Sequence, residues 1–338
     1  MKRILFYSSV NSLELFKTQK FYQIDISILK DLGYDVLLSN RIFDSLLFWK
    51  YDILFSYFYR YSFFAALLAK CFGKKTYFTG GIDSLDSDYA SAFNYKIQAL
   101  FFKLCYWVAD SCIIVSQSDL KNIFKVSSLK KKLSYSEHTI NTKLFIADVP
   151  KEKIFTSIVW MGDEGNVIRK GVDKALQIFA GLKKIPEFVD YRFVIIGRKG
   201  EGEVLVRSII DKYNLKGSVE LKGEVSEEDK INLLKQSKYY FQLSLYEGFG
   251  LAALEALCAN NIIIHSGKGG LANPIYKEQL LFDIDNDFDS ELVKLVNKLA
   301  CFTPITSYEN LLEYYDIQRR KDDFEAIIVN GKSNYKLK

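Results

Sequence analysis

Short apolar runs rich in β-forming residues alternate with helical stretches along nearly the whole chain, and this alternation limits the possible folds more than any other feature. The run ILFY at 4–7 predicts a strand, and residues 18–32 predict a helix that ends before Gly33. Further strands are expected at DVLLS, YDILFSY, KKTYFTG and SCIIVS, with the helical stretch SFFAALLAKCF among them. Because strands separated by helices pair in parallel, we expect a doubly wound α/β sheet in this half.

A second series of the same kind begins after residues 137–150, where the pattern lapses and where we place the interdomain link. Strands are expected at IFTSIVWMG, YRFVIIG, SVELKG, YYFQLSL, NIIIH and LLFDI, with helices between them and near 290–300 and 308–325. A length of 338 residues also favours two domains. We therefore expect two Rossmann-like domains facing each other across a cleft, at 1–145 and 146–305, and a C-terminal helix in 306–338 that packs back toward the first domain.

Basic and aromatic residues are concentrated in the first half. Residues 1–145 hold 19 Lys+Arg against 12 Asp+Glu, a net charge of +7, and 30 of the 51 aromatic residues; the remainder has a net charge of −2. The aromatic run at 49–64 and the basic run at 121–133 lead to the hypothesis that this half rests on anionic lipid, although buried strands could account for many of the aromatics. A nucleic-acid partner is not expected, because no reading motif accompanies the basic residues.

Targeting and metal signals are weak. The start MKRILFYSSV lacks a cleavage site, and no run approaches eighteen apolar residues, so we expect neither a signal peptide nor a spanning helix. Five cysteines without a C-x-x-C pair indicate reduced thiols, and we predict a cytoplasmic protein in peripheral contact with the inner face of the cell membrane. His138 and His265 are expected to be structural, and the acidic run at 283–289 lacks the glycine and glutamate of a calcium loop, so no metal is expected.

The segment EGFGLAALE at 247–255 carries the strongest functional signal. It follows the strand YYFQLSL and leads into a helix, a geometry that points backbone N–H groups and a positive dipole end at an anion. Gly248 and Gly250 permit close approach of a ligand to the backbone, and the amides from Phe249 to Leu251 could hold a phosphate.

Two glutamates flank this turn. Glu255 lies one helical turn beyond Leu251, where it could reach a sugar hydroxyl, and Glu247 would bond the other end of the same ligand. The alternative is that both glutamates only favour the first turn of the helix electrostatically, which leaves the glycines unexplained.

Two other loops follow strands of the second series and should reach the same edge of the sheet. In MGDEGNVIRKG, Arg169 and Lys170 precede Gly171 and a helix. The planar guanidinium of an arginine and the compact ammonium of a lysine together suit a pyrophosphate. The alternative is that the two side chains are a solvated cationic pair. In IIGRKGEGE, Gly197 and Arg198 begin a G-x-x-G-x-G order that is not the dinucleotide fingerprint.

These residues resemble a known family, the retaining nucleotide-sugar glycosyltransferases of GT-B fold in sequence family four, the glycosyl transferases group 1. Its signature is E-x7-E with G-F-G-L inside, which 247–255 matches residue by residue. The resemblance extends to four further stretches: ADSCIIVSQSDLKNIF, TINTKLF, RKGVDKAL and the run from SVELKG to GGLANPI. It therefore covers about 109–300.

The resemblance implies roles for individual residues. Glu247 would face the transferred sugar, Lys170 and a nearby arginine would neutralise the donor diphosphate, and Glu255 would bond the ribose. The other donor-binding residues would be Gly248, Phe249, Gly250, Leu251, Gly197, Arg198 and Val225. The donor would be a UDP or GDP sugar used as a substrate, with no separate cofactor, and transfer would retain the anomeric configuration without a metal.

The chain departs from the family pattern at two places. It has Gly162-Asp163 where the family usually has Gly-Arg, so we expect Arg169 to take the place of that arginine. It also has Gly80 and Gly81 where the family often has a histidine, and we place the acceptor side at Gly81 and Asp83.

The expected function is transfer of a sugar to a hydroxyl of a glycan or glycolipid, carried on a polyprenyl diphosphate in bacterial surface polysaccharide assembly (O-antigen, lipopolysaccharide or capsule). The alternatives are a catalytically silent nucleotide-sugar-binding subunit of a glycosyltransferase complex, indicated by the two departures, and a sugar-nucleotide epimerase.

Overall fold

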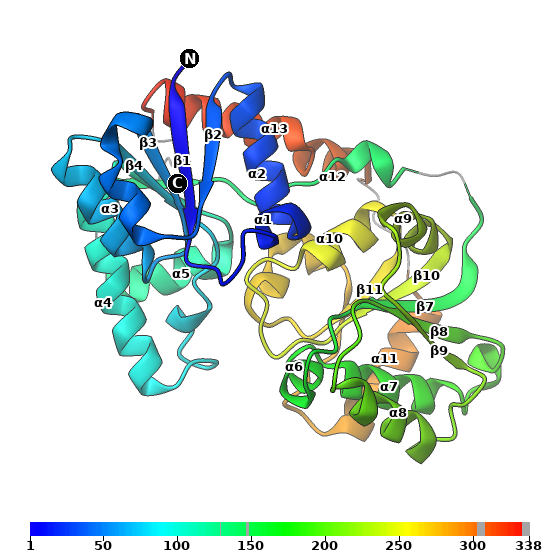
Figure 1. Cartoon of the computed structure of the whole chain (residues 1–338). Coiled ribbons are helices and arrows are strands. Elements are labelled where there is room, and N and C mark those ends of the chain that lie inside the picture. The colour runs from blue at the N-terminus through cyan, green and yellow to red at the C-terminus, as the bar shows by residue number, and fades with distance from the viewer. Residues whose placement is uncertain (129, 147–148, 303–307, 333–338) are drawn as a thin grey trace. The chain divides into compact units, whose positions relative to one another are not determined.

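The chain folds into two compact units. The computed structural model describes residues 1–128, 130–146, 149–302 and 308–332. Unit 1 comprises Met1–Ile140 and Tyr315–Lys338, and unit 2 comprises Asn141–Tyr314 (Figure 1). The first boundary lies five residues before the one expected at 145/146, and the other expected boundary, at 305/306, falls outside the described residues.

Unit 1 is built on a six-stranded parallel sheet with the order β2-β1-β3-β4-β5-β6. Strands β3 and β5 are buried along their whole length, as expected of a parallel sheet with helices on both faces. The elements are β1 (Arg3–Ser8), α1 (Leu15–Thr18), α2 (Lys20–Asp31), β2 (Asp35–Ser39), η1 (Ile42–Leu46), η2 (Phe48–Lys50), β3 (Ile53–Tyr57), α3 (Ser62–Cys71), β4 (Lys75–Thr79), η3 (Asp83–Leu85), α4 (Ala92–Val108), β5 (Ser111–Ile114), α5 (Gln117–Val126), β6 (Leu133–Tyr135), α13 (Ile317–Phe324) and η8 (Glu325–Val329).

Unit 2 is built on a second six-stranded parallel sheet, with the order β12-β11-β10-β7-β8-β9. Its core includes Phe155 of β7, whose ring stacks on Tyr239 and Phe241 of β10 with centroid distances of 4.6 and 5.0 Å. The elements are η4 (Thr142–Leu144), β7 (Glu152–Ile158), α6 (Glu164–Arg169), α7 (Val172–Leu182), η5 (Pro186–Phe188), β8 (Arg192–Ile196), α8 (Glu203–Lys212), β9 (Val219–Gly223), α9 (Glu227–Gln236), β10 (Ser237–Gln242), α10 (Leu251–Cys258), β11 (Ile262–His265), η6 (Gly269–Ala272), η7 (Pro274–Tyr276), β12 (Leu280–Leu281), α11 (Phe288–Ala300) and α12 (Tyr308–Tyr314).

The eleven strands expected from the sequence are all present, one further strand, β6, is additional, and several short helices, α6 among them, were not expected. Strand β6 begins at the last residue of the basic run at 121–133, and helix α6 lies in the segment interpreted as a loop. Both are short, three and six residues, so that neither completes enough periods to stand out in the sequence.

The C-terminal helix α13 belongs to unit 1 through a buried ion pair. The Arg320 guanidinium donates from Nε and Nη2 to the two carboxylate oxygens of Asp25 on α2, at 2.6 and 2.7 Å, and both side chains are fully buried. Arg320 also donates to the carbonyls of Ser136 and Glu137, and Tyr57 donates its hydroxyl to Asp25. Each nitrogen of the guanidinium therefore meets an acceptor, which is the condition for burying such a charge.

Most aromatic side chains of the run at 49–64 are packed inside unit 1, so the alternative explanation, burial in strands, holds for most of this run. Tyr51, Phe55, Tyr57, Tyr59 and Phe63 are buried, and only Trp49, Tyr61 and Phe64 of the aromatics are exposed. The reason is that β3 is a central strand.

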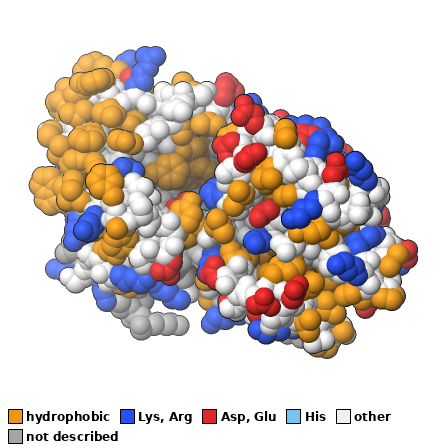
Figure 2. Space-filling view, turned by 90° about the horizontal axis from the view of Figure 1, so that it is seen from below, with side chains coloured by type: hydrophobic (Ala, Val, Ile, Leu, Met, Phe, Trp, Pro, Cys, Tyr) orange, Lys and Arg blue, Asp and Glu red, His pale blue; other side chains and the backbone are white. Residues whose placement is uncertain are grey.

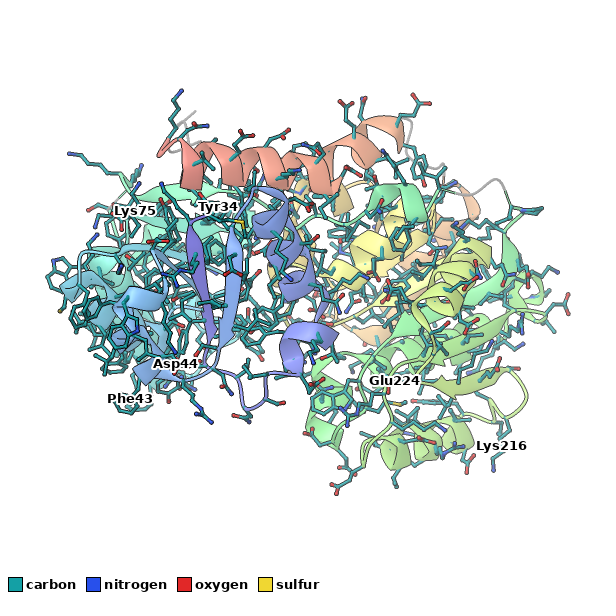
Figure 3. The ribbon with its side chains drawn as sticks, turned by 45° about the horizontal axis from the view of Figure 1, so that its top comes forward. Tyr34, Phe43, Asp44, Lys75, Lys216 and Glu224 are labelled. Carbon is teal, nitrogen blue, oxygen red and sulfur yellow. The ribbon has the colours of Figure 1, made fainter. Side chains whose placement is uncertain are left out.

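Figure 3 shows the two ends of this sheet. Tyr34 and Lys75 lie at one end, where β2 and β4 begin, and Phe43 and Asp44 lie beyond the other end, after β2.

Candidate functional site

The strand order of unit 2 identifies where a ligand should bind. The order reverses between β7 and β10, which are neighbours in the sheet although β8 and β9 lie between them along the chain. In sheets of this kind ligands bind beyond the carboxyl ends of the strands at such a switch point. The segment after β7 carries Lys170, and the segment after β10 carries Glu247.

Backbone contacts bring these two segments together. The amide of Leu245 donates to the carbonyl of Arg169 at 2.8 Å. Gly171 has a left-handed conformation (φ +68°), and a Cβ there would lie 2.0 Å from the carbonyl oxygen of Leu243, so that only glycine allows this approach. The contact places Lys170 beside the turn that follows β10.

Lys170 and Glu247 form an ion pair at this point. Lys170 Nζ lies 2.6 Å from Glu247 Oε1, and the two side chains are 24% and 11% exposed. The same oxygen accepts hydrogen bonds from Gln242 Nε2 at 2.8 Å and Ser244 Oγ at 2.7 Å. Three donors on one oxygen, Oε1, fix the carboxylate, and none of the described residues donates to Oε2.

Gln242 belongs to a directional hydrogen-bond chain that the sequence interpretation missed. The Ile158 amide donates to Tyr240 Oη, the Tyr240 hydroxyl donates to Gln242 Oε1, and Gln242 Nε2 donates to Ser244 and Glu247. Tyr240 is buried, and burial raises the pKa of its hydroxyl, so that it stays a donor. A glutamine at the end of an apolar strand was the available signal, since buried amides require partners.

The turn at 247–250 matches its expected geometry. Gly250 has φ +88° and precedes α10, whose start has no side-chain cap, so its first amides point outward without a side-chain acceptor. Phe249 is buried, and the carbonyl of Glu247 accepts the Gly270 amide at 2.6 Å. A Cβ on Gly270 would lie 2.5 Å from Phe249 Cα, which shows how closely the loop after β11 supports the turn.

Glu255 is buried on α10 and pairs with Lys230 of α9, at 2.8 Å from Nζ to Oε2. Lys230 also pairs with Glu227 at 3.1 Å. Burial disfavours the charged ammonium, but the two carboxylates outweigh it and raise the pKa of Lys230. Lys230 was not among the expected site residues, because it lies in a helix that reads as an ordinary charged surface helix.

Arg169 and Asp163 lie at opposite ends of α6. Arg169 Nη2 donates to Asn166 Oδ1 at 2.7 Å, and Asp163 caps the start of the helix by accepting the Asn166 amide at 2.7 Å. The aspartate in the family's arginine position therefore has a local structural role. The expectation that Arg169 replaces that arginine stays a prediction.

The glycines after β8 pack on the loop after β7. A Cβ on Gly197 would lie 2.0 Å from the carbonyl oxygen of Val159. A Cβ on Gly200 would lie 2.5 Å from the carbonyl oxygen of Met161. Arg198 is exposed and makes no side-chain hydrogen bond or ion pair within the described residues. Val225, after β9, packs against a small apolar cluster that includes Ile196.

The expected acceptor-side residues lie at the carboxyl end of β4 in unit 1. Gly81 is partly buried and Asp83 is exposed at the start of η3. Behind them lies Asp119, which the sequence interpretation missed: its Oδ1 accepts the Ile82 amide at 3.3 Å, and its buried Oδ2 has no partner among the described residues. Burial, with Asp83 nearby, raises the pKa of Asp119 to about 8.

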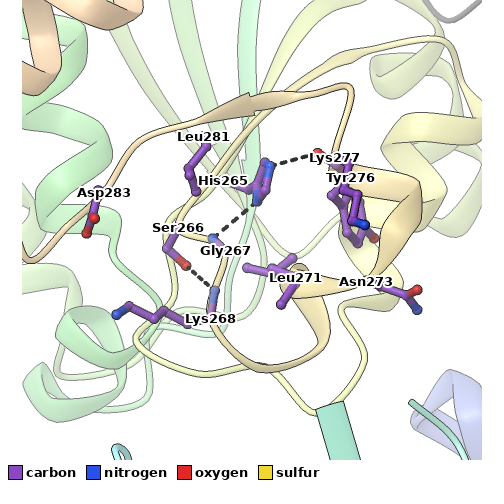
Figure 4. Close-up of a pocket in the computed structure, with 11 residues that line it drawn as sticks. His265, Ser266, Gly267, Lys268, Leu271, Asn273, Tyr276, Lys277, Leu281 and Asp283 are labelled. Atoms are coloured by element: carbon purple, nitrogen blue, oxygen red, sulfur yellow. Dashed lines mark hydrogen bonds between the residues drawn. The ribbon is translucent and has the colours of Figure 1, made fainter. Parts of the chain in front are cut away.

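Both histidines are buried. His265 Nδ1 accepts the Gly267 amide and Nε2 faces the carbonyl of Tyr276, both at 3.1 Å, which defines a neutral imidazole with its proton on Nε2. Burial lowers its pKa to about 4. It borders a cavity of about 440 Å³ whose lining includes Lys268 and Asp283 (Figure 4). Burial also lowers the pKa of His138 well below its ordinary value.

The acidic run at 283–289 serves the start of α11. Asp287 caps that helix by accepting the Ser290 amide, and Asp285 pairs with Lys268. Across the described ranges, no group of three or more His, Cys, Asp or Glu side chains could hold a metal ion. No described helix is long and apolar enough to cross a bilayer.

Known sequences are similar mainly to the second half of the chain. Residues 166–300 match the family model described as Glycosyl transferases group 1. The chain is 31% identical over 144 residues to a GDP-mannose:cellobiosyl-diphosphopolyprenol alpha-mannosyltransferase of Xanthomonas oryzae pv. oryzae. It is 28% identical over 109 residues to the phosphatidylinositol N-acetylglucosaminyltransferase GPI3 subunit of Saccharomyces cerevisiae. These alignments cover 36% and 32% of this chain but only 37% and 24% of the two relatives.

Comparison with solved structures concerns the fold. The Anabaena protein HepE in complex with UDP superimposes with a TM-score of 0.72 and 13% identity, over 98% of this chain and 100% of that one. Sucrose-phosphate synthase from Thermosynechococcus elongatus gives a TM-score of 0.66 and 16% identity, over 98% and 97%. The GT-B fold predicted from the sequence is thus confirmed, and the resemblance to the glycosyl transferases group 1 is confirmed over residues 166–300.

Proposed function

We propose that this protein transfers a sugar from a nucleotide-diphosphate donor to a hydroxyl of a glycan or glycolipid, with retention at the anomeric carbon. The GT-B fold and the match of residues 166–300 to the glycosyl transferases group 1 model support this proposal. The observation that carries the proposal is the Lys170–Glu247 pair, held at the sheet's switch point beside the uncapped start of α10. A cation next to the first amides of a helix suits a diphosphate.

The proposed chemistry depends on charge and position. As the bond between the anomeric carbon and the diphosphate oxygen breaks, negative charge grows on the leaving diphosphate, where Lys170, Arg169 and the amides of α10 would stabilise it. The leaving phosphate would take the acceptor proton, so no protein base and no metal are required. Glu247, fixed through Oε1, would present Oε2 to the transferred sugar, and Glu255 would bond the ribose hydroxyls.

The acceptor is proposed from the relatives. The Xanthomonas relative is named for an acceptor on a diphosphopolyprenol, and we propose an acceptor of this class, used in bacterial surface polysaccharide assembly at the cytoplasmic face of the membrane. A nucleotide-sugar-binding subunit without turnover is the second candidate. It is favoured by Asp163, which caps α6 where the family carries an arginine, and by Gly80 and Gly81 in place of a histidine.

Donor binding can be tested by a thermal-shift screen against UDP, GDP and ADP sugars. We expect one base to raise the unfolding temperature clearly, because a ligand present at 100 times its Kd stabilises the folded state by about 2.7 kcal/mol. The same donor should give no shift with Glu255→Ala, whereas Glu278→Ala, an exposed glutamate in the same unit, should respond like the parent protein. No shift with any nucleotide sugar would contradict the proposal; a shift without transfer to any acceptor would favour the silent subunit.

Replacing Gln242 by leucine should lower kcat/KM for transfer about tenfold, since Glu247 loses one of the three hydrogen bonds that orient it. Nucleotide binding, measured with UDP or GDP alone by calorimetry, should change by less than about twofold, because the proposed nucleotide contacts are at Glu255 and the start of α10 and do not include Gln242. The exposed Gln236→Leu serves as the control. An equal loss in nucleotide affinity would show that Gln242 supports the whole pocket and does not act through Glu247.

A further inference from the structure

Helix α4 carries large apolar side chains on its outer face. Phe93, Leu100 and Trp107 are 72%, 56% and 68% exposed, and Lys96 and Lys103 lie between them. The successive spacings of three, four, three and four residues place all five on one side of the helix. Over 17 residues this side is about 25 Å long.

The opposite side of α4 already has its partners. Gln98, Phe102, Cys105 and Tyr106 are buried in unit 1, so the exposed side cannot turn inward without emptying the core. Residues 92–108 contain no aspartate or glutamate. Lys96 and Lys103 form no ion pair within the described parts of the chain, so their charges remain available to an anionic surface.

Neighbouring elements extend the surface. On α3, which packs beside α4, Phe64 is exposed and its ring lies 6.2 Å from that of Phe101. Phe43, on η1, which packs beside α3, and Trp49, on η2, are 76% and 60% exposed. Figure 2 shows many hydrophobic side chains over the part of the surface on the left, with Lys and Arg side chains among them, and Figure 3 shows Phe43 projecting from the fold.

We propose that this surface, which we call the α4 face (Phe93, Lys96, Leu100, Lys103 and Trp107, with Phe43, Trp49 and Phe64 beside it), lies on an anionic lipid bilayer. Isolated apolar residues on a surface need no explanation, but several large exposed aromatic side chains on neighbouring elements do. Aromatic rings enter the interfacial layer of a bilayer, and lysines between them meet anionic headgroups. A second copy of the chain is a poorer partner. If two copies paired through this face, their lysines would lie close together with no carboxylate to neutralise them.

This inference deepens the proposed function, because it brings unit 1 to the surface where a polyprenyl-linked acceptor would lie. It also changes the set of residues first suspected: the aromatics at 49–64 are mostly buried, only Trp49 and Phe64 of them belong to the α4 face, and its other aromatics are Phe43, Phe93 and Trp107. Lys132, from the basic run, donates to the carbonyls of Tyr106 and Trp107 at the end of α4 and so supports the helix.

Cosedimentation with vesicles tests the inference without any transfer reaction, so its failure would leave the transferase proposal intact. We expect the protein to pellet with vesicles of phosphatidylcholine and phosphatidylglycerol, more strongly at low salt, and not with phosphatidylcholine alone. Lys96→Gln with Lys103→Gln should lower the partition coefficient roughly 25-fold, about fivefold for each charge. Phe93→Ser with Trp107→Ser should lower it at least about tenfold.

The control is Val204→Ser with Val293→Ser, which removes two valines of unit 2 that are 70% and 61% exposed and should leave pelleting unchanged. Unaltered unfolding temperatures would show that each variant folds. The inference is overturned if the parent protein stays in solution with anionic vesicles, or if the α4 variants pellet as it does. It is also overturned if the parent protein is a dimer by light scattering that the α4 variants convert to a monomer, since a second copy would then cover the face.

Discussion

Replacing Lys170 by methionine is expected to lower kcat/KM for sugar transfer by about 10²- to 10³-fold. Methionine keeps the length and apolar stem of lysine but removes the only cation bonded to Glu247 among the described residues. Charge that develops on the leaving diphosphate would lose a fixed counter-charge in a partly buried position, a loss of roughly 3 to 4 kcal/mol in the transition state. Transfer measured by mass spectrometry of the product, at several donor concentrations, gives the ratio.

The control for this prediction is Lys174→Met, one helical turn further along the same segment. Lys174 is also only partly exposed, but no ion pair links it to another described residue, so its replacement should leave kcat/KM within about twofold. Activity of Lys170→Met above a tenth of the parent value would mean that the diphosphate does not contact this ammonium. In that case the proposed site, and with it the role of Glu247, would have to be abandoned.

Replacing Arg320 by methionine should destabilise unit 1 by about 3 to 5 kcal/mol. The substitution leaves the Asp25 carboxylate fully buried with the Tyr57 hydroxyl but without its cation, and breaking a buried pair by removing one partner has a cost of this size. Urea unfolding followed by tryptophan fluorescence can assign the loss, because Trp49 and Trp107 report on unit 1 and Trp160 on unit 2.

Two further variants separate the charge from the helix. Lys321→Met changes the next residue of α13, which is only partly buried, and should shift stability by less than about 0.5 kcal/mol. Combining Arg320→Met with Asp25→Leu removes both charges and should be less harmful than Arg320→Met alone. If the double variant instead loses as much stability as the two single variants together, this contact contributes through packing and not through the ion pair.

Much of the fold follows from local patterns. All eleven strands expected from apolar runs are present, since a buried parallel strand needs nothing more than a short run of such residues between helices. The turn at 247–250 could also be anticipated, because Gly248 and Gly250 before a helix-forming run leave few alternatives. The missed strand β6 has three residues in a lysine-rich segment, where no local pattern marks it.

The partners inside the site were not predictable in the same way. Lys230 lies 25 positions from Glu255, and Gln242 is a polar residue in an apolar strand whose partner, Glu247, lies beyond the strand end. Asp119 reads as an ordinary first-turn acid of α5, yet it is fully buried behind the loop that carries Gly81 and Asp83. Each of these pairings depends on which elements the sheet makes neighbours.

The amino-acid sequence by itself determined the α/β class, the two series of strands, the diphosphate-suited turn and the identity of its two glutamates, because periodicity and turn chemistry act over a few residues. Only the tertiary structure decided that Lys170 meets Glu247, that Arg320 joins Asp25 across 295 positions, and that α4 presents its aromatic side to the outside. The physical reason is that ion pairing and burial are set by distances in space, which the order of strands in a sheet creates and which local sequence does not contain.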